Sequence, residues 1–562
     1  MHIVDTNALR SRLDYEPQEL RFGTSGRRGE VVHLTQLEVY INVLAELEYL
    51  QSRTVAEGGI LRGQKFYFAY DLRPSSSTYV PSQRGRGEIA QAVECAIRDA
   101  GMQPVNLGCI PTPALTCYAV SLGRGSIMIT GSHIPFDRNG YKTNTARGEL
   151  LKEDEEPINQ AVQQVRERIY REPFAESPFD QQGLFKSGRR ELPAECDEAR
   201  TAYIERYTSF FHGLSLDGKR LVVYQHSAVG RDVLVEILER LGAKVIPSGR
   251  SNTFVPLDTE NIDDAQLATI QQLADDAIAK HGPIDAVVST DGDSDRPLIL
   301  GVDRETGRVQ FFGGDLVGMI GALYLGTDAV VVPISCNDAI DRGPLAPVTE
   351  PKTRIGSPYV IAGMEKARNK GKQRICGWEA NGGFLTGSDI AQNGKLLPAL
   401  RTRDAMLPIL CVLFAAHEKG LSLTELFRVL PRRFSRAALL HQFPKPIAVK
   451  IVKRFSPQDR NIQEVVFDSG AAASEMENIR KHLESFFTPQ LGFGTITRLN
   501  YIDGVRIIFS NGDVAHLRPS GNADEFRIYA VADTQARANS IAKMGVAEPG
   551  GILRLLEKSV TS

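Results

Sequence analysis

The chain has 562 residues, a length that at roughly 150 residues per domain predicts about three to four domains. Hydrophobic residues make up 42% of the sequence and charged residues 24%, which excludes a fibrous or broadly disordered protein. The formal net charge of −2 gives no overall attraction to nucleic acid or to an anionic membrane, although a local basic site remains compatible with it.

Seven cysteines lie scattered along the chain without CxxC spacing. This pattern argues against a disulfide framework and a thiolate zinc site, and it favours the reducing cytoplasm. The amino terminus lacks the apolar region of a signal peptide, and no apolar run approaches about 18 residues. We therefore expect a cytoplasmic protein without a transmembrane helix, in which the apolar run 406–416 forms a buried helix.

Three stretches repeat one pattern, in which a β-branched or aromatic run is followed by a polar loop and then by an amphipathic segment. The runs lie at 65–70, 220–224 and 329–334, and the amphipathic segments lie at 88–100, 231–241 and 359–370. A further strand is expected at 244–247. Strands that alternate with helices of this length predict βαβ units and parallel or mixed sheets.

The end of the chain has a different pattern. Short strands separated by turn signals are expected at 462–467, 494–499, 504–509 and 514–517, which predicts an α+β module. We therefore predict the α/β class: three similar α/β domains with mixed sheets, followed by a C-terminal α+β domain, around a central cleft. The expected domains are 1–190, 191–312, 313–435 and 436–562.

Three aspartates alternate in the segment 290–296, directly after the apolar run 284–289. Asp291, Asp293 and Asp295 can turn their carboxylates toward one hard divalent cation, and Gly292 eases the bend between them. The Gly and Glu that complete an EF-hand loop are missing, which argues against calcium sensing. The segment predicts a magnesium site, with a solvated acidic turn as the alternative.

A possible nucleophile lies in the segment 127–135, where Ser132 and His133 follow a predicted strand. Together with Lys142 further along the chain, they offer a hydroxyl nucleophile, a proton-transfer group and a cation for phosphate oxygens. Adjacent Ser and His do not make a triad signature, and no G-x-S-x-G elbow encloses the serine. An ordinary polar turn explains this segment equally well.

Two further segments carry arginines beside glycine. In the segment 518–524, Arg518 precedes a Ser-Gly-Asn turn, and Arg527 follows it. Two guanidinium groups, a hydroxyl and turn amides make a suitable cradle for a phosphate dianion. Arg28, in the segment 22–29, can bind an anion or simply cap a turn.

The segment 377–383 is rich in glycine and presents Glu379 and Asn381, which can hydrogen-bond vicinal hydroxyls. Trp378, the only tryptophan, is expected to pack at a domain edge rather than against a sugar. A nucleophile, a metal loop, a hydroxyl-binding loop and a phosphate cradle together suit phosphoryl transfer on a phosphosugar, because such transfer needs positioning and charge neutralisation.

In wording and order, these motifs resemble the α-D-phosphohexomutase superfamily, which includes phosphoglucomutase, phosphomannomutase, phosphoglucosamine mutase and phosphoacetylglucosamine mutase. The resemblance covers nearly the whole chain. It implies a magnesium-dependent isomerase that interconverts hexose 6-phosphate and hexose 1-phosphate. The implied reaction proceeds through a phosphoserine and through hexose 1,6-bisphosphate, which serves as intermediate and activator.

The resemblance also implies roles for individual residues. The catalytic residues would be Ser132, His133, Lys142 and Arg28, and the metal ligands would be Ser132, Asp291, Asp293 and Asp295. The substrate-binding residues would be Arg296, Glu379, Asn381, Arg518, Ser520, Gly521, Asn522 and Arg527.

The motifs depart from the family pattern in ways that affect substrate choice. Residues 131–135 read Gly-Ser-His-Ile-Pro instead of the usual Ala-Ser-His-Asn-Pro, a wording that resembles phosphomannomutases. Asn381 instead resembles the acetylglucosamine branch, and Ser357 stands where some relatives place a histidine, so no general base is assigned there. The resemblance favours mannose phosphate, with glucose phosphate as a second substrate, and leaves phosphoglucosamine and phosphoacetylglucosamine mutases open.

Two other activities remain open. One is a phosphosugar phosphatase, in which water accepts the phosphoryl group, and the other is a non-catalytic phosphosugar-binding regulator. Retention of Ser132 and of all three aspartates argues against the regulator. We expect a small phosphosugar as the partner, no nucleic acid, no membrane, and a monomer or homodimer.

Overall fold

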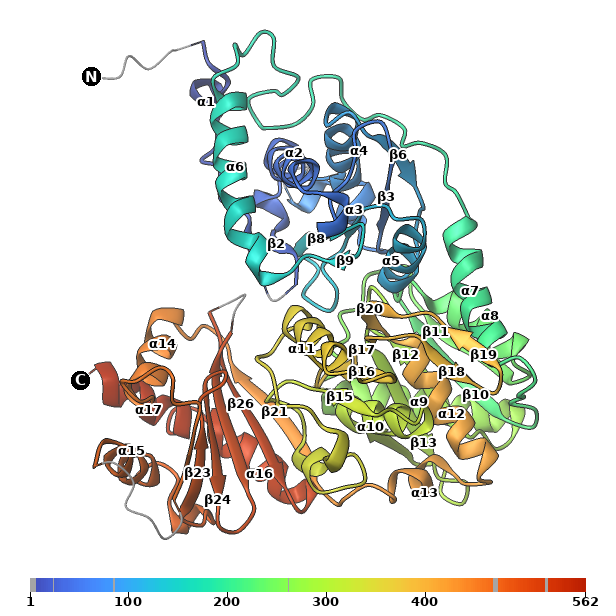
Figure 1. Cartoon of the computed structure of the whole chain (residues 1–562), viewed down its shortest axis with the longest axis vertical. Coiled ribbons are helices and arrows are strands. Elements are labelled where there is room, and N and C mark those ends of the chain that lie inside the picture. The colour runs from blue at the N-terminus through green and yellow to red at the C-terminus, as the bar shows by residue number, and fades with distance from the viewer. Residues whose placement is uncertain are drawn as a thin grey trace.

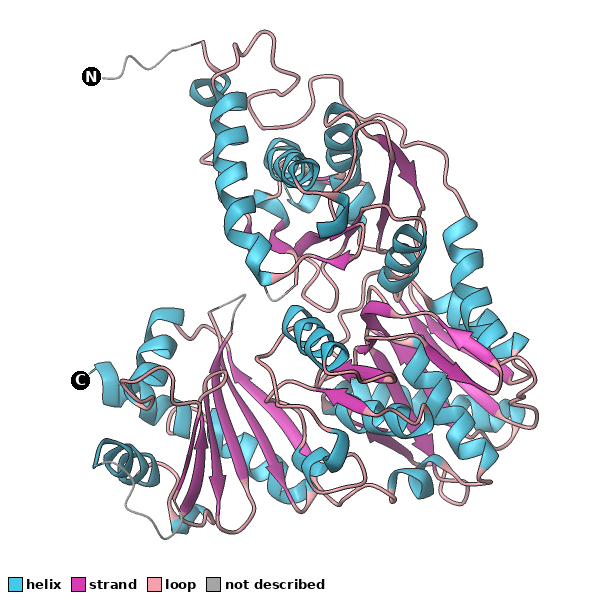
Figure 2. Ribbon diagram, viewed as in Figure 1, coloured by secondary structure: helices cyan, strands magenta, loops and turns pink. Residues whose placement is uncertain are grey.

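The computed structural model describes residues 7–23, 25–83, 86–260, 262–467, 474–520 and 524–561. Three mixed sheets with helices follow one another along the chain, and a fourth sheet with its own helices forms the C-terminal part (Figures 1 and 2). The predicted fold class is confirmed. We call the parts that carry these sheets domains I to IV, and the limits at residues 190, 312 and 435 stay predictions.

Domain I contains a sheet of order β1-β2-β8-β7-β3-β6, with β9 paired to β8. Parallel pairing joins β7, β3 and β6, whereas β2, β8 and β7 are antiparallel. The turn that carries Ser132 follows β7, and Lys142 lies on β8. The strands are β1 Arg21–Phe22, β2 Arg27–Glu30, β3 Lys65–Tyr70, β4 Tyr79–Val80, β5 Arg86–Gly87, β6 Gln103–Asn106, β7 Ser126–Ile129, β8 Arg138–Thr145 and β9 Gly148–Glu149. The helices are α1 Leu9–Arg12, α2 Gln36–Ser52, α3 Pro74–Ser77, α4 Ile89–Asp99, α5 Thr112–Ser121 and α6 Glu155–Tyr170.

Domain II contains a sheet of order β11-β10-β12-β13-β14. Its first three strands are parallel, and β12, β13 and β14 are antiparallel. The loop with the three aspartates therefore turns the chain from β12 into β13. The elements are β10 Arg220–His226, β11 Lys244–Arg250, β12 Ala286–Thr290, β13 Pro297–Val302, β14 Val309–Phe312, α7 Glu198–Phe210, α8 Arg231–Arg240 and α9 Asp264–His281.

Domain III contains a sheet of order β15-β16-β17-β20. The loop with Glu379 connects β16 to β17, and helix α12 is buried from Met406 to Ala416, as its apolar sequence predicts. In the described part of the chain, no helix is long and apolar enough to cross a membrane. The elements are β15 Ala329–Val331, β16 Ile375–Trp378, β17 Phe384–Thr386, β18 Ile390–Gln392, β19 Lys395–Leu397, β20 Leu400–Asp404, α10 Gly314–Tyr324, α11 Ser357–Asn369, α12 Met406–Glu418 and α13 Leu423–Phe427.

Domain IV contains an antiparallel sheet of order β21-β26-β25-β24-β23-β22. The sequence patterns predict four of these strands and miss β21 and β26. The elements are β21 Phe434–Leu440, β22 Glu464–Val466, β23 Ile496–Asn500, β24 Val505–Phe509, β25 Val514–Pro519, β26 Phe526–Ala532, α14 Lys445–Arg454, α15 Ser474–Glu484, α16 Gln535–Val546 and α17 Ile552–Thr561.

Domains I to III share an apolar core, whereas domain IV has its own. One cluster of buried side chains runs through domains I, II and III, and includes Leu115, Val288 and Leu410. Domain IV has a separate cluster around residues such as Ile507 and Ile528. Burial of apolar surface is the dominant stabilising term in folded proteins, so domains I to III are held together by a shared core that domain IV does not enter.

A buried carboxylate fastens helix α7 to domain III. The hydroxyls of Tyr203 and Tyr207 both donate to Asp404, which also accepts from the main-chain N–H of Met406 at 3.0 Å. Asp404 is 2% exposed. A buried carboxylate is tolerated only when donors surround it, and here those donors come from two domains.

We predict that Tyr203→Phe lowers the free energy of unfolding by about 1–3 kcal/mol, because it leaves a buried acceptor with one donor fewer. Urea unfolding measures the loss. The control Tyr324→Phe removes a hydroxyl that donates to the exposed Glu418 at 2.8 Å, and should cost less than about 0.5 kcal/mol. Equal effects of the two variants would contradict the assigned role of Asp404.

Candidate active site

Ser132 lies in a tight turn after β7 and joins domain I to domain II. Its φ is +56°, and its main-chain N–H donates to Thr130 Oγ1 at 2.7 Å. Its hydroxyl donates to Asp291 Oδ2 at 2.8 Å and lies 3.3 Å from His133 Nδ1. Ser132 is only 4% exposed. The predicted nucleophile therefore contacts the predicted metal loop directly.

The guanidinium of Arg73 holds this turn in place. It donates to four main-chain carbonyls, those of Ser132, Ile134, Pro135 and Arg138. Its Cζ lies 3.8 Å from the ring centroid of Phe254. A Cβ on Gly131 would lie 2.6 Å from Arg73 Cζ, which accounts for the glycine immediately before Ser132.

The three aspartates come together as predicted. One carboxylate oxygen from each of Asp291, Asp293 and Asp295 lies within 4.8 Å of the others, and all three residues are buried. Among the described residues, Asp293 Oδ1 and Asp295 Oδ1 are buried and have no hydrogen-bond partner. Buried oxygens without donors are costly, and a hard cation such as Mg²⁺ would satisfy them. The residues present therefore fit a magnesium ion.

Close packing holds the metal loop against the serine turn. A Cβ on Gly292 would lie 2.5 Å from the main-chain oxygen of Ser132, so a larger residue would push the two loops apart. Thr112, at the start of α5, donates its hydroxyl to Asp293 Oδ2 at 2.6 Å. Domain I thus contacts the metal loop at more than one point.

Cations surround the metal loop. Lys142 Nζ lies 2.6 Å from both Asp293 Oδ2 and Asp295 Oδ2, and Arg296 Nε lies within 3.8 Å of Asp291 and 3.7 Å of Asp295. Burial and the other two aspartates raise the pKa of Asp291 well above its ordinary value. Burial alone would raise the pKa of Asp293, but Lys142 holds it below its usual range.

Arg403 on β20 links the metal loop to the predicted sugar loop. Its guanidinium donates to Asp295 Oδ2 at 2.7 Å and to Glu379 Oε2 at 2.8 Å. Asn381 Oδ1 accepts from the N–H of Gly383 at 3.0 Å. The side-chain amide nitrogen of Asn381 has no protein partner among the described residues. Trp378 is fully buried and stacks with Phe384, as expected for a packing role.

The electrostatic environment affects two further predicted catalytic residues. Burial, together with Arg73 and Arg403, lowers the pKa of Arg28 to about 10 against the opposing effect of Asp293. Arg28 therefore remains charged at neutral pH. Burial and Arg296 lower the pKa of His133 to about 3, so this imidazole is neutral at the same pH.

The structure describes part of the predicted phosphate cradle. Arg518 and Arg527 are register partners on β25 and β26 and so share one face of the sheet. Arg518 Nε donates to Asp503 Oδ1 at 3.1 Å, and Arg527 Nη2 donates to Glu525 Oε2 at 3.1 Å. The N–H of Ser520 donates to the main-chain oxygen of Glu525. Gly521 and Asn522 lie outside the described residues.

Apart from Arg28, the predicted residues of domains I and II thus form one contact network, and Glu379 of domain III joins it through Arg403. Arg28 donates to the main-chain oxygens of Arg27 and Tyr141. Arg527 makes no direct contact with this network among the described residues, but it is near enough to lower the pKa of His133. Sequence reasoning missed Arg73 and Arg403. Arg73 could have been found from its position directly after the strand 65–70, because ligand-binding residues often lie at the carboxyl ends of strands in such sheets.

Comparison with known proteins places this arrangement in a family. The models described as phosphoglucomutase/phosphomannomutase, alpha/beta/alpha domains I, II and III, match residues 19–169, 201–304 and 314–434. A phosphomannomutase of Sinorhizobium fredii is 37% identical over 527 residues, which cover 94% of this chain and 98% of that protein. A phosphomannomutase of Salmonella muenchen is 36% identical, over 93% of this chain and 94% of its own.

Solved structures share the fold. A phosphoglucomutase/phosphomannomutase family protein from Burkholderia thailandensis superposes with a TM-score of 0.60 at 17% identity, covering 96% of this chain and 97% of its own. The N-acetylphosphoglucosamine mutase of Aspergillus fumigatus, solved with GlcNAc-6P and magnesium, gives a TM-score of 0.54 at 14% identity and covers 98% of both chains. The chain therefore belongs to the phosphoglucomutase/phosphomannomutase family of the α-D-phosphohexomutase superfamily, as its motifs predict.

Proposed function

We propose that this chain is a phosphohexomutase that interconverts mannose 6-phosphate and mannose 1-phosphate, with glucose phosphate as a second substrate. The observation that carries the proposal is the 2.8 Å contact between the Ser132 hydroxyl and Asp291, inside a loop with two buried and unsatisfied carboxylate oxygens. This geometry supports a role for Ser132 as a phosphorylated hydroxyl beside a bound cation. The 36–37% identity to phosphomannomutases over most of the chain supports mannose.

In the proposed reaction, phosphorylated Ser132 gives its phosphoryl group to a free hydroxyl of the hexose monophosphate. The bond from phosphorus to Ser132 Oγ breaks and a bond from phosphorus to the sugar oxygen forms. The proton of the sugar hydroxyl ends on Ser132 Oγ, which leaves as a free hydroxyl. The resulting hexose 1,6-bisphosphate turns round and returns its other phosphoryl group to Ser132. In that return step the serine proton passes to the departing sugar oxygen, and the neutral His133, 3.3 Å from Ser132 Oγ, would orient the serine hydroxyl.

Charge balance explains the need for a metal. Asp291, Asp293 and Asp295 face three cations, Lys142, Arg296 and Arg403. Phosphorylation of Ser132 would add a charge of roughly −1.5 to −2. A Mg²⁺ ion held by the three aspartates and the serine phosphate would neutralise that charge and polarise the transferring group.

The two ends of the substrate have separate binding groups. Arg518 and Arg527, with Ser520, Gly521 and Asn522, would hold the phosphate that does not react. Glu379 and Asn381 would hydrogen-bond the sugar hydroxyls. Because the cradle recognises only a dianion, it accepts the phosphate at either end of the hexose. Arg28 and Lys142 would stabilise the transferring phosphate.

We also propose a cytoplasmic location and a small phosphosugar as the sole substrate partner. All seven cysteines are free in the structure, which suits a reducing compartment. The monomeric or homodimeric state stays a prediction.

The function is tested by supplying mannose 1-phosphate with Mg²⁺ and a trace of hexose 1,6-bisphosphate to the purified protein. We expect mannose 6-phosphate as the product. Glucose 1-phosphate should be converted more slowly, and glucosamine and N-acetylglucosamine 1-phosphates more slowly still.

Ser132→Ala should reduce turnover at least about 10³-fold, since the covalent step is lost. The control Ser227→Ala alters another buried loop serine and should retain activity. Release of inorganic phosphate would indicate a phosphatase, and near-normal turnover by Ser132→Ala would refute the mechanism.

Metal dependence is tested by binding as well as by activity. EDTA should abolish turnover and Mg²⁺ should restore it. In thermal unfolding, Mg²⁺ at 100 times its Kd should stabilise the wild-type protein by about 2.7 kcal/mol. Asp293→Asn should lose this stabilisation, whereas Asp303→Asn, which alters an exposed carboxylate of the same domain, should keep it. Equal stabilisation of both variants would remove Asp293 from the metal site.

Arg73 is proposed as a positioning residue for Ser132, because it ties down the carbonyls on both sides of the serine turn. Arg73→Met should lower kcat about 10- to 100-fold, the cost of a misplaced reacting group. KM should change less than about threefold, because Arg73 is remote from the sugar and phosphate loops in this proposal. The control Arg231→Met removes an arginine that also binds loop carbonyls and should leave kcat unchanged. A large rise in KM with normal kcat would contradict the role.

A further inference from the structure

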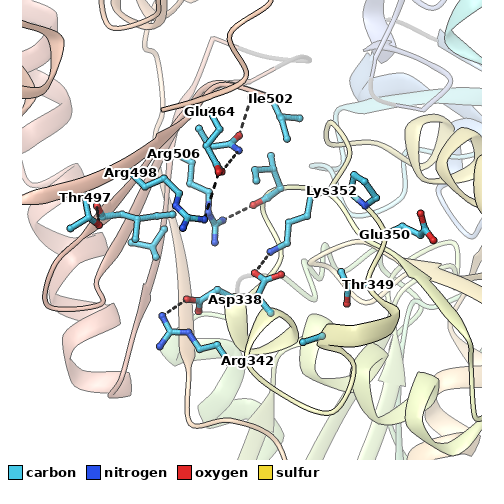
Figure 3. Close-up of a pocket in the computed structure, with 17 residues that line it drawn as sticks. Asp338, Arg342, Thr349, Glu350, Lys352, Glu464, Thr497, Arg498, Ile502 and Arg506 are labelled. Carbon is cyan, nitrogen blue, oxygen red and sulfur yellow. Dashed lines mark hydrogen bonds and ion pairs between the residues drawn. The ribbon is translucent and has the colours of Figure 1, made fainter. Parts of the chain in front are cut away.

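A cavity of about 690 Å³ lies between domains III and IV, a volume typical of sites for small molecules. Figure 3 shows side chains of both domains pointing into it. Domain III contributes residues between Ile334 and Lys352, and domain IV contributes residues of β22 to β25 and of the turn before β24. None of the residues assigned above to the nucleophile, the metal, the sugar or the phosphate cradle lines this cavity.

Most charges around the cavity are paired within their own domain. Lys352 Nζ lies 2.5 Å from Asp341, and Arg342 lies 2.7 Å from Asp338. Arg498 lies 3.7 Å from Glu464. The remaining carboxylate on the wall, Glu350, lies 2.6 Å from Lys370. In each pair the two charges cancel. Every carboxylate on the wall of the cavity therefore has a cation beside it.

Arg506 is the exception. It lies on β24, is 3% exposed, and projects toward domain III in Figure 3. Its Nη1 donates to the main-chain oxygen of Ile334, but no carboxylate oxygen of the described residues lies within 4 Å of its guanidinium. Burial lowers the pKa of Arg506, against the opposing effect of the carboxylates of Asp338 and Asp341. Burial, together with the charge of Arg506, also lowers the pKa of Lys352. A buried cation without a carboxylate in direct contact is costly.

We propose that this cavity is a binding site for a small phosphate-bearing anion, held by Arg506 from domain IV and Lys352 from domain III. A guanidinium presents a planar fork of N–H groups that matches phosphate oxygens, and only one of those groups is used by Ile334. The ammonium of Lys352, already 2.5 Å from Asp341, would contact the anion as well from the facing wall (Figure 3). The anion would supply the direct charge contact that no carboxylate of the described residues makes with Arg506.

An anion in this cavity would act on the phosphate cradle through the neighbouring chain. Ile502 lines the cavity, and the next residue, Asp503, accepts from Arg518 Nε at 3.1 Å and from the N–H of Ile355 at 2.9 Å. Asp503 thus ties Arg518 to domain III. Because domain IV has a separate apolar core, an anion that bridges the two domains would stabilise the position of Arg518. The site is separate from the mutase reaction, so its test does not depend on activity.

The test is calorimetric titration of the full-length protein with pyrophosphate in buffer without divalent cations. We expect two sites in the wild-type chain, one in the cradle and one in the cavity. Arg506→Met should weaken one site at least tenfold and leave the other, whereas Arg527→Met should weaken only the other site. The matched control Arg342→Met alters a cavity residue that is half-exposed and paired with Asp338, and should change neither site more than about twofold.

Several outcomes would overturn the proposal. These are a single pyrophosphate site that Arg527→Met removes, two sites that Arg506→Met leaves unchanged, or citrate binding in the cavity as tightly as pyrophosphate. If Arg506→Met fails to fold, as judged by circular dichroism, Lys352→Met replaces it. That variant should weaken the same site at least threefold, and unchanged binding would equally refute the assignment.

Discussion

The active site depends on three buried carboxylates in one hairpin turn. Asp291, Asp293 and Asp295 lie together with almost no exposure to solvent, so their charge has to be balanced by nearby groups. Cations from three domains lie beside these carboxylates: Lys142 from domain I, Arg296 from domain II and Arg403 from domain III. The carboxylates of the metal loop thus pair with cations from all three of the domains that share the apolar core.

Close packing adds precision to this electrostatic attraction. Gly131 leaves room for the Arg73 guanidinium, and Gly292 lets the metal loop approach the main chain of Ser132. Both glycines lie in turns that directly follow buried strands. The strands provide rigid supports, and the short turns place the hydroxyl and the carboxylates within hydrogen-bond distance. Domain IV is attached differently, because its own core leaves mainly polar contacts such as Asp503 with Ile355 at the boundary.

The family and its chemistry were readable from local patterns. Strands at 65–70 and 220–224, the buried helix at 406–416 and the alternating aspartates at 291–295 all appear in the structure as predicted. Such features depend on hydrophobic periodicity and on residue types at strand ends, which are properties of a short segment. Strands β21 and β26 were not predicted. In the segment 434–440, charged and small residues do not alternate clearly with apolar ones. The segment 526–532 begins directly after residues that were interpreted as a phosphate-binding turn.

By itself, the sequence determined the α/β class, the order of the functional loops and the family to which the chain belongs. Tertiary structure alone decided which distant residues complete the site. Arg73 lies 59 residues before Ser132, and Arg403 lies 108 residues after Asp295, and no local pattern connects either pair. The structure also showed that Arg506 is buried and that no carboxylate of the described residues lies within 4 Å of its guanidinium. Burial and charge pairing arise only when separate domains pack, so they have no signature along the chain.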